Sequence, residues 1–157
     1  MGFLGNKKGS IISDYFMILH DLGQIKANNA VDVALYTDHL ELSAPLSKQP
    51  ISLRYNQITD VYYGIETEIA HKNKSVIGRA VVGGLLFGST GAAVGALSAA
   101  GAKAKKVYKH LFIISYKSSS GADAFLQFED TRKYKGEKIA KKLKELCKNE
   151  DPVITSL

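Results

Sequence analysis

The sequence predicts an α+β fold: an antiparallel, partly open β-barrel or sandwich, capped by a C-terminal amphipathic helix and interrupted by an inserted Gly/Ala-rich helical hairpin. Three observations predict it. Apolar residues alternate with polar ones in short runs between residues 31 and 69, and again between 111 and 128. The period becomes helical over residues 130–148. Between the two groups of runs, residues 80–102 carry no charge and are rich in Gly and Ala.

The composition fits one domain over residues 1–157. With 45% hydrophobic and 23% charged residues, the chain is neither disordered nor a multi-span membrane protein. A net charge of +6 fits an anionic lipid or nucleic-acid partner, and equally a lysine-rich solvated surface. Cys147 is the single cysteine, which excludes an internal disulfide, and the N-terminus lacks the pattern of a signal peptide. We therefore expect a cytoplasmic protein.

The first predicted elements lie before the glycine-rich run. Residues 11–22 fit either a strand or a short helix, and helical spacing of the apolar residues favours a helix. That spacing is shared by Ile12, Tyr15, Phe16 and Leu19. Two half-buried strands joined by a tight turn at Thr37-Asp38 follow. Their alternating apolar residues are Val31, Val33, Leu35, Leu40 and Leu42.

Further strands are predicted on both sides of the glycine-rich run, four in all before it and two or three after it. Ile51, Leu53 and Tyr55 alternate in the third. One face of the fourth carries Val61, Tyr63, Ile65, Thr67 and Ile69, and its other face Asp60, Glu66 and Glu68. After the run, residues 111–114 are continuously apolar and residues 118–121 form a turn. The last strand alternates at Ala124, Leu126 and Phe128.

A C-terminal helix is predicted over residues 130–148. Asp130-Thr131 can cap its start. Its apolar stripe consists of Ile139, Leu143, Leu146 and Cys147. The lysines fall largely off that stripe, so they form either a phosphate-binding face or the solvated side of the helix. They are Lys138, Lys141, Lys142, Lys144 and Lys148.

Three stretches and the closing helix carry a family resemblance over about residues 28–148, apart from the insertion. The stretches read "VALYTDHLEL", "ISLRYNQITDVYYG" and "LFIISYKSSSGADAFLQFED". In this order they resemble the pleckstrin-homology-like (PH-like) superfold, in its GRAM and bacterial PH-like variety. The resemblance implies a binding or scaffold module without catalysis, for phosphoinositides or proteins, with ring-like oligomers in some bacterial members. Lipid-binding members gather basic residues in the first hairpin loop. Thr37-Asp38, taken as that loop, is short and acidic, which argues against phosphoinositide recognition of that kind.

The glycine-rich run does not match a nucleotide-binding loop. Gly83 to Thr90, "GGLLFGST", has Ser89 where the phosphate-binding lysine of such a loop belongs. Small residues instead recur every four positions, which lets another helix approach closely. One such row is Ala80, Gly84, Gly88, Ala92, Ala96 and Ala100, and a second is Gly91, Gly95 and Ala99. Residues 76–104 therefore resemble the glycine-zipper hairpins of bacterial membrane-associated proteins, with "GSTG" at 88–91 as the turn.

The length of the run alone would permit a membrane span. As one straight helix, its 23 uncharged residues would be long enough to cross the hydrocarbon core of a bilayer. A single crossing, however, would separate strands that must share one core, and both flanks are positively charged. Two helices of about 10 residues reach only about 15 Å, half the hydrocarbon thickness. A re-entrant or interfacial hairpin, association with other copies, and packing on the protein's own sheet all remain open.

No catalytic or metal-binding pattern accompanies these elements. His20, His39, His71 and His110 are scattered, and no nucleophile motif is present. We expect no enzyme activity, no cofactor, no metal and no nucleic-acid partner. The leading hypothesis is membrane association or self-assembly through the hairpin. The alternative is a soluble protein-interaction module whose hairpin packs on its own sheet.

The leading hypothesis assigns three groups of contact residues. Membrane or assembly contact is assigned to Val81, Val82, Leu85, Leu86 and Phe87. Close helix packing is assigned to Gly84, Gly88, Gly91 and Gly95. Contact with anionic lipid is assigned to Lys72, Lys74, Arg79, Lys103, Lys105 and Lys106. The expected partners are an anionic membrane surface on the cytoplasmic side, further copies of the chain, or another protein.

Overall fold

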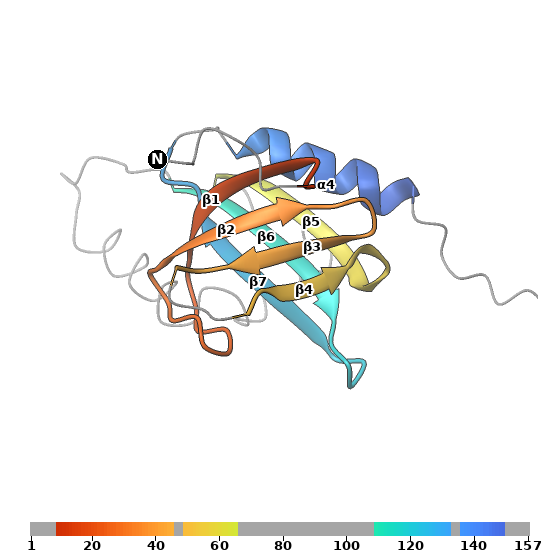
Figure 1. The fold of residues 1–157 in the computed structure, drawn as a ribbon, viewed down its shortest axis with the longest axis horizontal. Helices are drawn as coiled ribbons and strands as arrows, with labels where there is room; N and C mark the ends of the chain where they lie inside the picture. Colours follow the sequence, from red (N-terminus) through yellow and green to blue (C-terminus); the bar gives the residue numbers. More distant parts are fainter. Residues whose placement is uncertain (1–8, 46–48, 66–108, 133–135, 150–157) are drawn as a thin grey trace, which may run out of the picture.

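The computed structural model describes residues 9–45, 49–65, 109–132 and 136–149 (Figure 1). Within these ranges seven strands form one antiparallel sheet in the order β4-β3-β2-β1-β7-β6-β5. The strands before the glycine-rich run are β1 (Ile12–Ile18), β2 (Ala30–Leu35), β3 (His39–Ser43), β4 (Ile51–Arg54) and β5 (Ile58–Ile65). Those after it are β6 (His110–Lys117) and β7 (Asp123–Glu129). A 3₁₀ turn, η2 (Tyr55–Gln57), and a helix, α4 (Glu137–Asn149), complete the described elements.

The predicted strands and turns are confirmed at most positions. A tight turn joins β2 to β3, where the Tyr36 amide donates to the His39 carbonyl at 2.8 Å. Another joins β6 to β7, where the Ser118 amide donates to the Ala122 carbonyl at 2.9 Å. Tyr55 is an exception, since it lies in η2 rather than in a strand. The residues of the fourth predicted strand beyond Ile65 lie outside the described residues.

The helix favoured for residues 11–22 is wrong, because Ile12–Ile18 form β1. This strand pairs with β2 from Ile12↔Leu35 to Met17↔Ala30, and with β7 at Ile18↔Phe128. Its apolar residues four positions apart satisfy a strand face as well as a helix face, because four is a multiple of the strand period of two. Backbone pairing with β2 on one side and β7 on the other holds this segment in the strand conformation.

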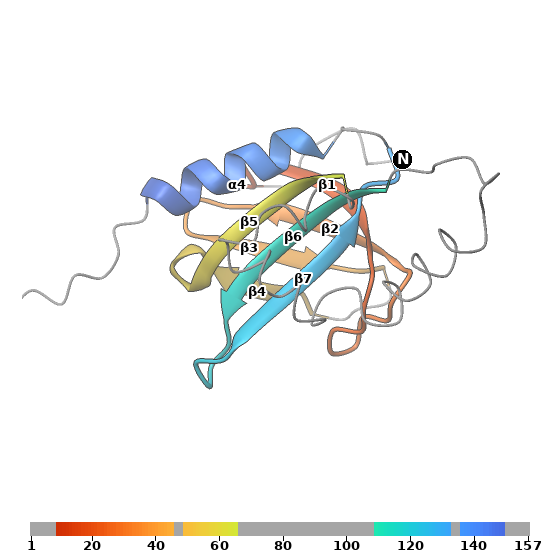
Figure 2. The same ribbon diagram turned by 180° about the vertical axis from the view of Figure 1, so that it is seen from behind.

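The barrel core lies between two halves of the curved sheet. Figures 1 and 2 show β2, β3 and β4 on one side and β5, β6 and β7 crossing behind them, with α4 along one open edge. β1 belongs to both halves because it pairs on one side with β2 and on the other with β7. Phe16, Phe112 and Phe128 meet in the centre, with ring centroids 5.1–5.9 Å apart. Aromatic contacts at these distances contribute beyond the apolar area that they bury.

Helix α4 closes the open edge of the barrel, but it begins later than predicted. It starts at Glu137 rather than at Asp130. The predicted apolar stripe is confirmed: Ile139 and Leu143 are buried with Ala140 in the barrel core, while Leu146 and Cys147 pack against it half-buried. Asp130 still serves the start of the helix, because its Oδ2 accepts a hydrogen bond from the Gly136 amide at 2.7 Å. The capping carboxylate therefore acts across an intervening turn.

Candidate functional site

The two strands that flank the glycine-rich run in the sequence, β5 and β6, are neighbours at one edge of the sheet. β5, the last strand of the sheet, pairs with β6 in register, and Ile65 stands directly opposite His110. The intervening chain therefore leaves β5 and returns to β6 at adjacent positions. The strands that flank the segment share one core through Val61 and Phe112, as the sequence predicted. We call the meeting of Ile65 and His110 the junction.

Every residue that the sequence assigned to the contact site lies outside the described residues. This holds for the apolar contact group Val81, Val82, Leu85, Leu86 and Phe87, and for the packing glycines Gly84, Gly88, Gly91 and Gly95. It also holds for the cationic group Lys72, Lys74, Arg79, Lys103, Lys105 and Lys106. In the part of the chain that the structure describes, no helix is both long and apolar enough to cross a membrane.

A buried hydrogen-bond network fixes the described side of the junction. The Asp130 amide donates to the His110 carbonyl at 2.8 Å, which extends the pairing beyond β7. The Asp130 side chain is buried and accepts from the Tyr63 hydroxyl at 2.5 Å and from the Arg132 amide at 3.0 Å. Lys109 is the first described residue after the segment, and its Nζ lies 4.0 Å from Oε1 of Glu129. The chain therefore returns to the sheet at a firmly held point.

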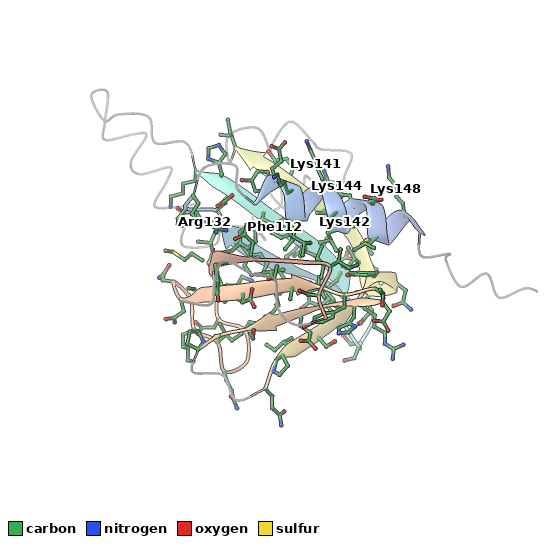
Figure 3. All side chains as sticks on the ribbon, turned by 45° about the horizontal axis from the view of Figure 1, so that its top comes forward. Phe112, Arg132, Lys141, Lys142, Lys144 and Lys148 are labelled. Carbon is green, nitrogen blue, oxygen red and sulfur yellow. The ribbon has the colours of Figure 1, made fainter. Side chains whose placement is uncertain are left out.

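Helix α4 presents a row of lysines away from the barrel. Lys138, Lys141, Lys144 and Lys148 are exposed and spaced three or four residues apart, so they share one side of the helix. Figure 3 shows three of them, Lys141, Lys144 and Lys148, along the helix on the side away from the strands. Lys141 pairs with Glu137 at 3.4 Å, and on the flank Lys142 pairs with Glu145 at 3.6 Å. With five lysines and two glutamates, α4 keeps an excess of positive charge.

The first hairpin loop is residues 19–29, between β1 and β2, and not Thr37-Asp38 as the sequence interpretation took it. The error follows from the missed strand β1. Within the true first loop, Lys26 lies 3.7 Å from Asp21, and the same aspartate accepts the Ala27 amide at 2.9 Å. Lys26 is the single lysine or arginine among residues 19–29, so this loop also lacks a gathering of basic residues.

The β2–β3 turn holds a compact polar cluster. The His39 ring stacks on Tyr36 with centroids 4.8 Å apart, and its Nδ1 lies 2.6 Å from an Asp38 carboxylate oxygen. The hydrogen bond with Asp38 raises the pKa of His39, a more distant contact with Glu41 adds to it, and burial opposes both. In return, the His39 hydrogen bond lowers the pKa of Asp38. His39 therefore interacts with Tyr36 and Asp38 in the turn and with Glu41 on β3.

The sheet has a second buried surface besides the barrel core. Tyr62, Leu111 and Ile113 are buried, yet they do not belong to the core cluster, because they lie on the opposite face of β5 and β6. We call these three residues the outer patch. The sequence interpretation assigned them no role.

Among the described residues, no group of three or more His, Cys, Asp or Glu side chains could hold a metal ion.

Comparison with known proteins gives one family. A family model described as "Glycine zipper containing PH domain" matches residues 22–128. The match runs from the first hairpin loop to β7 and includes the glycine-rich segment. No curated protein sequence matches the chain.

Proposed function

Because the chain belongs to the family of glycine zipper-containing PH domains, we propose that it is a binding module that attaches to an anionic membrane surface through its glycine-rich segment. The family match confirms the predicted resemblance to a PH-like domain with a glycine zipper. PH-like domains are generally non-catalytic modules that bind lipids or proteins. The membrane role and the contact residues go further than the family does.

The junction is the observation that carries the proposal. Because Ile65 and His110 are neighbours in one sheet, both flanks of the segment start from the same edge of the domain. Both flanks are basic: Lys72, Lys74 and Arg79 precede the run, and Lys103, Lys105 and Lys106 follow it. Each lysine or arginine near an anionic leaflet contributes about 1 kcal/mol of binding free energy. Two basic flanks tied to one edge can therefore act on one membrane face together.

Apolar contact would come from the first half of the run. Val81, Val82, Leu85, Leu86 and Phe87 supply large side chains next to the basic flank. Burial of such side chains contributes about 1.5–3 kcal/mol each. An interfacial or re-entrant segment needs both apolar burial and positive charge, because apolar burial provides the affinity for the membrane and the lysines select anionic headgroups. The lysine row of α4 adds positive charge on the same domain.

Self-assembly is the second candidate, favoured by the four-residue repeat of small residues. Gly84, Gly88, Gly91 and Gly95 allow a neighbouring helix to approach closely. Glycine costs up to about 1 kcal/mol per helical position relative to alanine, so a helical role for this run requires a compensating contact. Copies of the chain are one source of that contact.

Vesicle flotation tests the membrane proposal. We expect the protein to float with vesicles of phosphatidylcholine and phosphatidylglycerol at low salt, to float less at high salt, and to stay behind with phosphatidylcholine alone. Lys103→Gln/Lys105→Gln should weaken flotation strongly. The matched charge control is Lys26→Gln/Lys117→Gln, which removes lysines that pair with Asp21 and Asp123 away from the junction. A wild-type protein that remains unbound at low salt contradicts the membrane proposal.

Light scattering of the same samples tests self-assembly. We expect an oligomer whose population falls in Gly88→Leu, because a leucine blocks the close approach of helices. Gly121→Asn serves as the control. Gly121 has a positive φ of 84° that asparagine tolerates better than other residues do, and a side chain there meets open space. A monomer at all concentrations rules out self-assembly and leaves the membrane proposal standing.

A further inference from the structure

Strand β6 is buried on both faces, although an antiparallel sheet of this kind commonly turns one face to water. Phe112 and Ile114 point into the barrel core and are 0% exposed. Leu111 and Ile113 alternate with them and lie on the opposite face, yet they are only 1% and 0% exposed. Ser115, next on that face, is also buried. A strand whose outer face is in contact with solvent would leave Leu111 and Ile113 more exposed than this.

The neighbouring strand continues the same surface. Tyr62 stands directly opposite Ile113 and is 4% exposed, while Gly64 stands opposite Leu111. The Tyr62 hydroxyl donates to the Ile65 carbonyl at 2.9 Å, so the ring lies along the strand toward the junction. A Cβ added at Gly64 would come within 2.7 Å of that hydroxyl. Tyr62 of the outer patch therefore packs closely against Gly64, which adds no side chain of its own to this face.

The described elements do not account for this burial. In-plane neighbours alone leave the side chains of a sheet face partly accessible, and on the same face of β7 Asp123 is exposed and Phe125 only half-buried. Helix α4 does not serve as the cover, because its buried residues Ile139 and Leu143 belong to the barrel core together with Val61. The burial of the outer patch therefore calls for a cover that the described elements do not supply.

We propose that the outer patch is the docking site of this chain's own glycine-rich segment, residues 76–104. The described chain breaks off at Ile65, three residues after Tyr62, and resumes at Lys109, two residues before Leu111. Forty-three residues thus start and finish beside the patch. A tethered segment has a high effective concentration at such a site, which favours it over a second copy.

The composition of the segment suits this site. Val81, Leu85 and Phe87 provide apolar side chains for the patch, and the glycines between them permit close approach to Tyr62 and Gly64. Docking and insertion into lipid use the same apolar side chains, so the two exclude each other. The docking proposal stands apart from the membrane proposal and is tested without vesicles.

Thiol labelling in the full-length chain tests the docking site. Cys147 is replaced by serine, and single cysteines are placed at Ile113→Cys on the outer patch, Val33→Cys in the barrel core and Ser119→Cys on the exposed β6–β7 turn. We expect the outer-patch thiol to react with a maleimide at least about tenfold more slowly than the turn thiol, at every protein concentration. Adding Leu85→Lys/Leu86→Lys should raise the rate at Ile113→Cys and leave Val33→Cys protected, which shows that the barrel stays folded.

Each other outcome overturns the proposal. Fast labelling of Ile113→Cys in the parent background means that the patch is bare. Protection that disappears on dilution means that a second copy covers it. Protection that survives Leu85→Lys/Leu86→Lys means that a different part of the chain covers it. Leu111→Cys repeats the measurement at a second position of the patch, in case Ile113→Cys destabilises the sheet.

Discussion

The hydroxyl of Tyr63 donates a hydrogen bond to the buried carboxylate of Asp130 at 2.5 Å, across 67 residues of sequence. The same Asp130 oxygen accepts the Gly136 amide at 2.7 Å. Tyr63 lies on β5 two residues before the junction, and Gly136 immediately precedes α4. One carboxylate thus ties the start of the capping helix to the strand that leads into the glycine-rich segment, so changes at Asp130 should affect the whole open edge of the barrel.

Asp130→Ala should lower the free energy of unfolding by about 3 kcal/mol, because it leaves one buried donor at Gly136 and two part-buried donors at Tyr63 and Arg132 without their acceptor. Tyr63→Phe removes only one of these bonds and should cost about 1–2 kcal/mol. Urea denaturation followed by circular dichroism measures both changes. Equal losses for the two variants would mean that the Gly136 and Arg132 bonds contribute nothing to stability.

Gly136→Ala should destabilise the protein by about 1–3 kcal/mol through overpacking. An added Cβ would lie 2.3 Å from Cε1 of Phe16 and 2.9 Å from the Asp130 carboxylate, so neither neighbour can accommodate it without moving. Phe16→Leu in the same chain should recover part of the loss. Lys138→Ala, two residues away on the exposed side of α4, is the control and should change stability by less than about 0.5 kcal/mol. A stable Gly136→Ala protein would contradict the packing at the start of α4.

The β2–β3 turn should contribute most to stability in mildly acidic solution. The pKa of His39 is raised by Asp38, so its contribution is complete below the ordinary imidazole pKa of about 6.5 and is lost as the pH rises through the raised value. The pKa of Asp38 is lowered by His39, so its contribution is present above about pH 4 and is lost as the pH falls through the lowered value. The maximum therefore lies between about pH 4 and 6.5.

Proton NMR of the His39 ring measures this coupling directly. Asp38→Asn should bring the pKa of His39 down toward its ordinary value, with Glu41 as the remaining acidic neighbour. The positive charge of Arg54, which stands opposite His39 on β4, also lowers the pKa of Asp38. Asp123→Asn removes a carboxylate that pairs with Lys117 and is not among the groups that shift the pKa of His39, so it should leave the His39 titration unchanged. An Asp38→Asn protein with an unaltered His39 pKa would show that the hydrogen bond does not set it.

Much of the fold could be predicted from the sequence because local patterns determine it. Period-two alternation located β2 to β5 and β7, a continuous apolar run located β6, and the helical stripe located the buried side of α4. β1 could not be assigned by the same test, since Ile12 and Phe16 lie four residues apart and fit either period. The start of α4 at Glu137 was also out of reach, because its capping carboxylate, Asp130, acts from beyond an intervening turn.

The candidate site was less accessible to sequence patterns. The likeness to a glycine zipper could be read from the four-residue spacing, but the adjacency of Ile65 and His110 depends on the register of two strands that are separated by 44 residues of sequence. The outer patch did have a signal. Residues 111–114 are continuously apolar, and such a run is typical of a strand that is buried on both faces. The alternating apolar residues of β5 and β7 predicted only the sheet face that points into the barrel core. No role was therefore predicted for Tyr62 or Ile113 on the opposite face.

Ile113 and Ile114 offer a matched comparison of the two faces of β6. Both are isoleucines at 0% exposure on the same strand, but only Ile114 belongs to the barrel core. If a second layer covers the outer patch, Ile113→Ala should cost about 2–4 kcal/mol, close to the cost of Ile114→Ala, because both leave a cavity. If the patch faces water, Ile113→Ala should cost about 0.5 kcal/mol or less, as a surface substitution does. Urea denaturation of the two variants distinguishes these values, and a large loss at Ile114 alone would remove the basis for docking on this face.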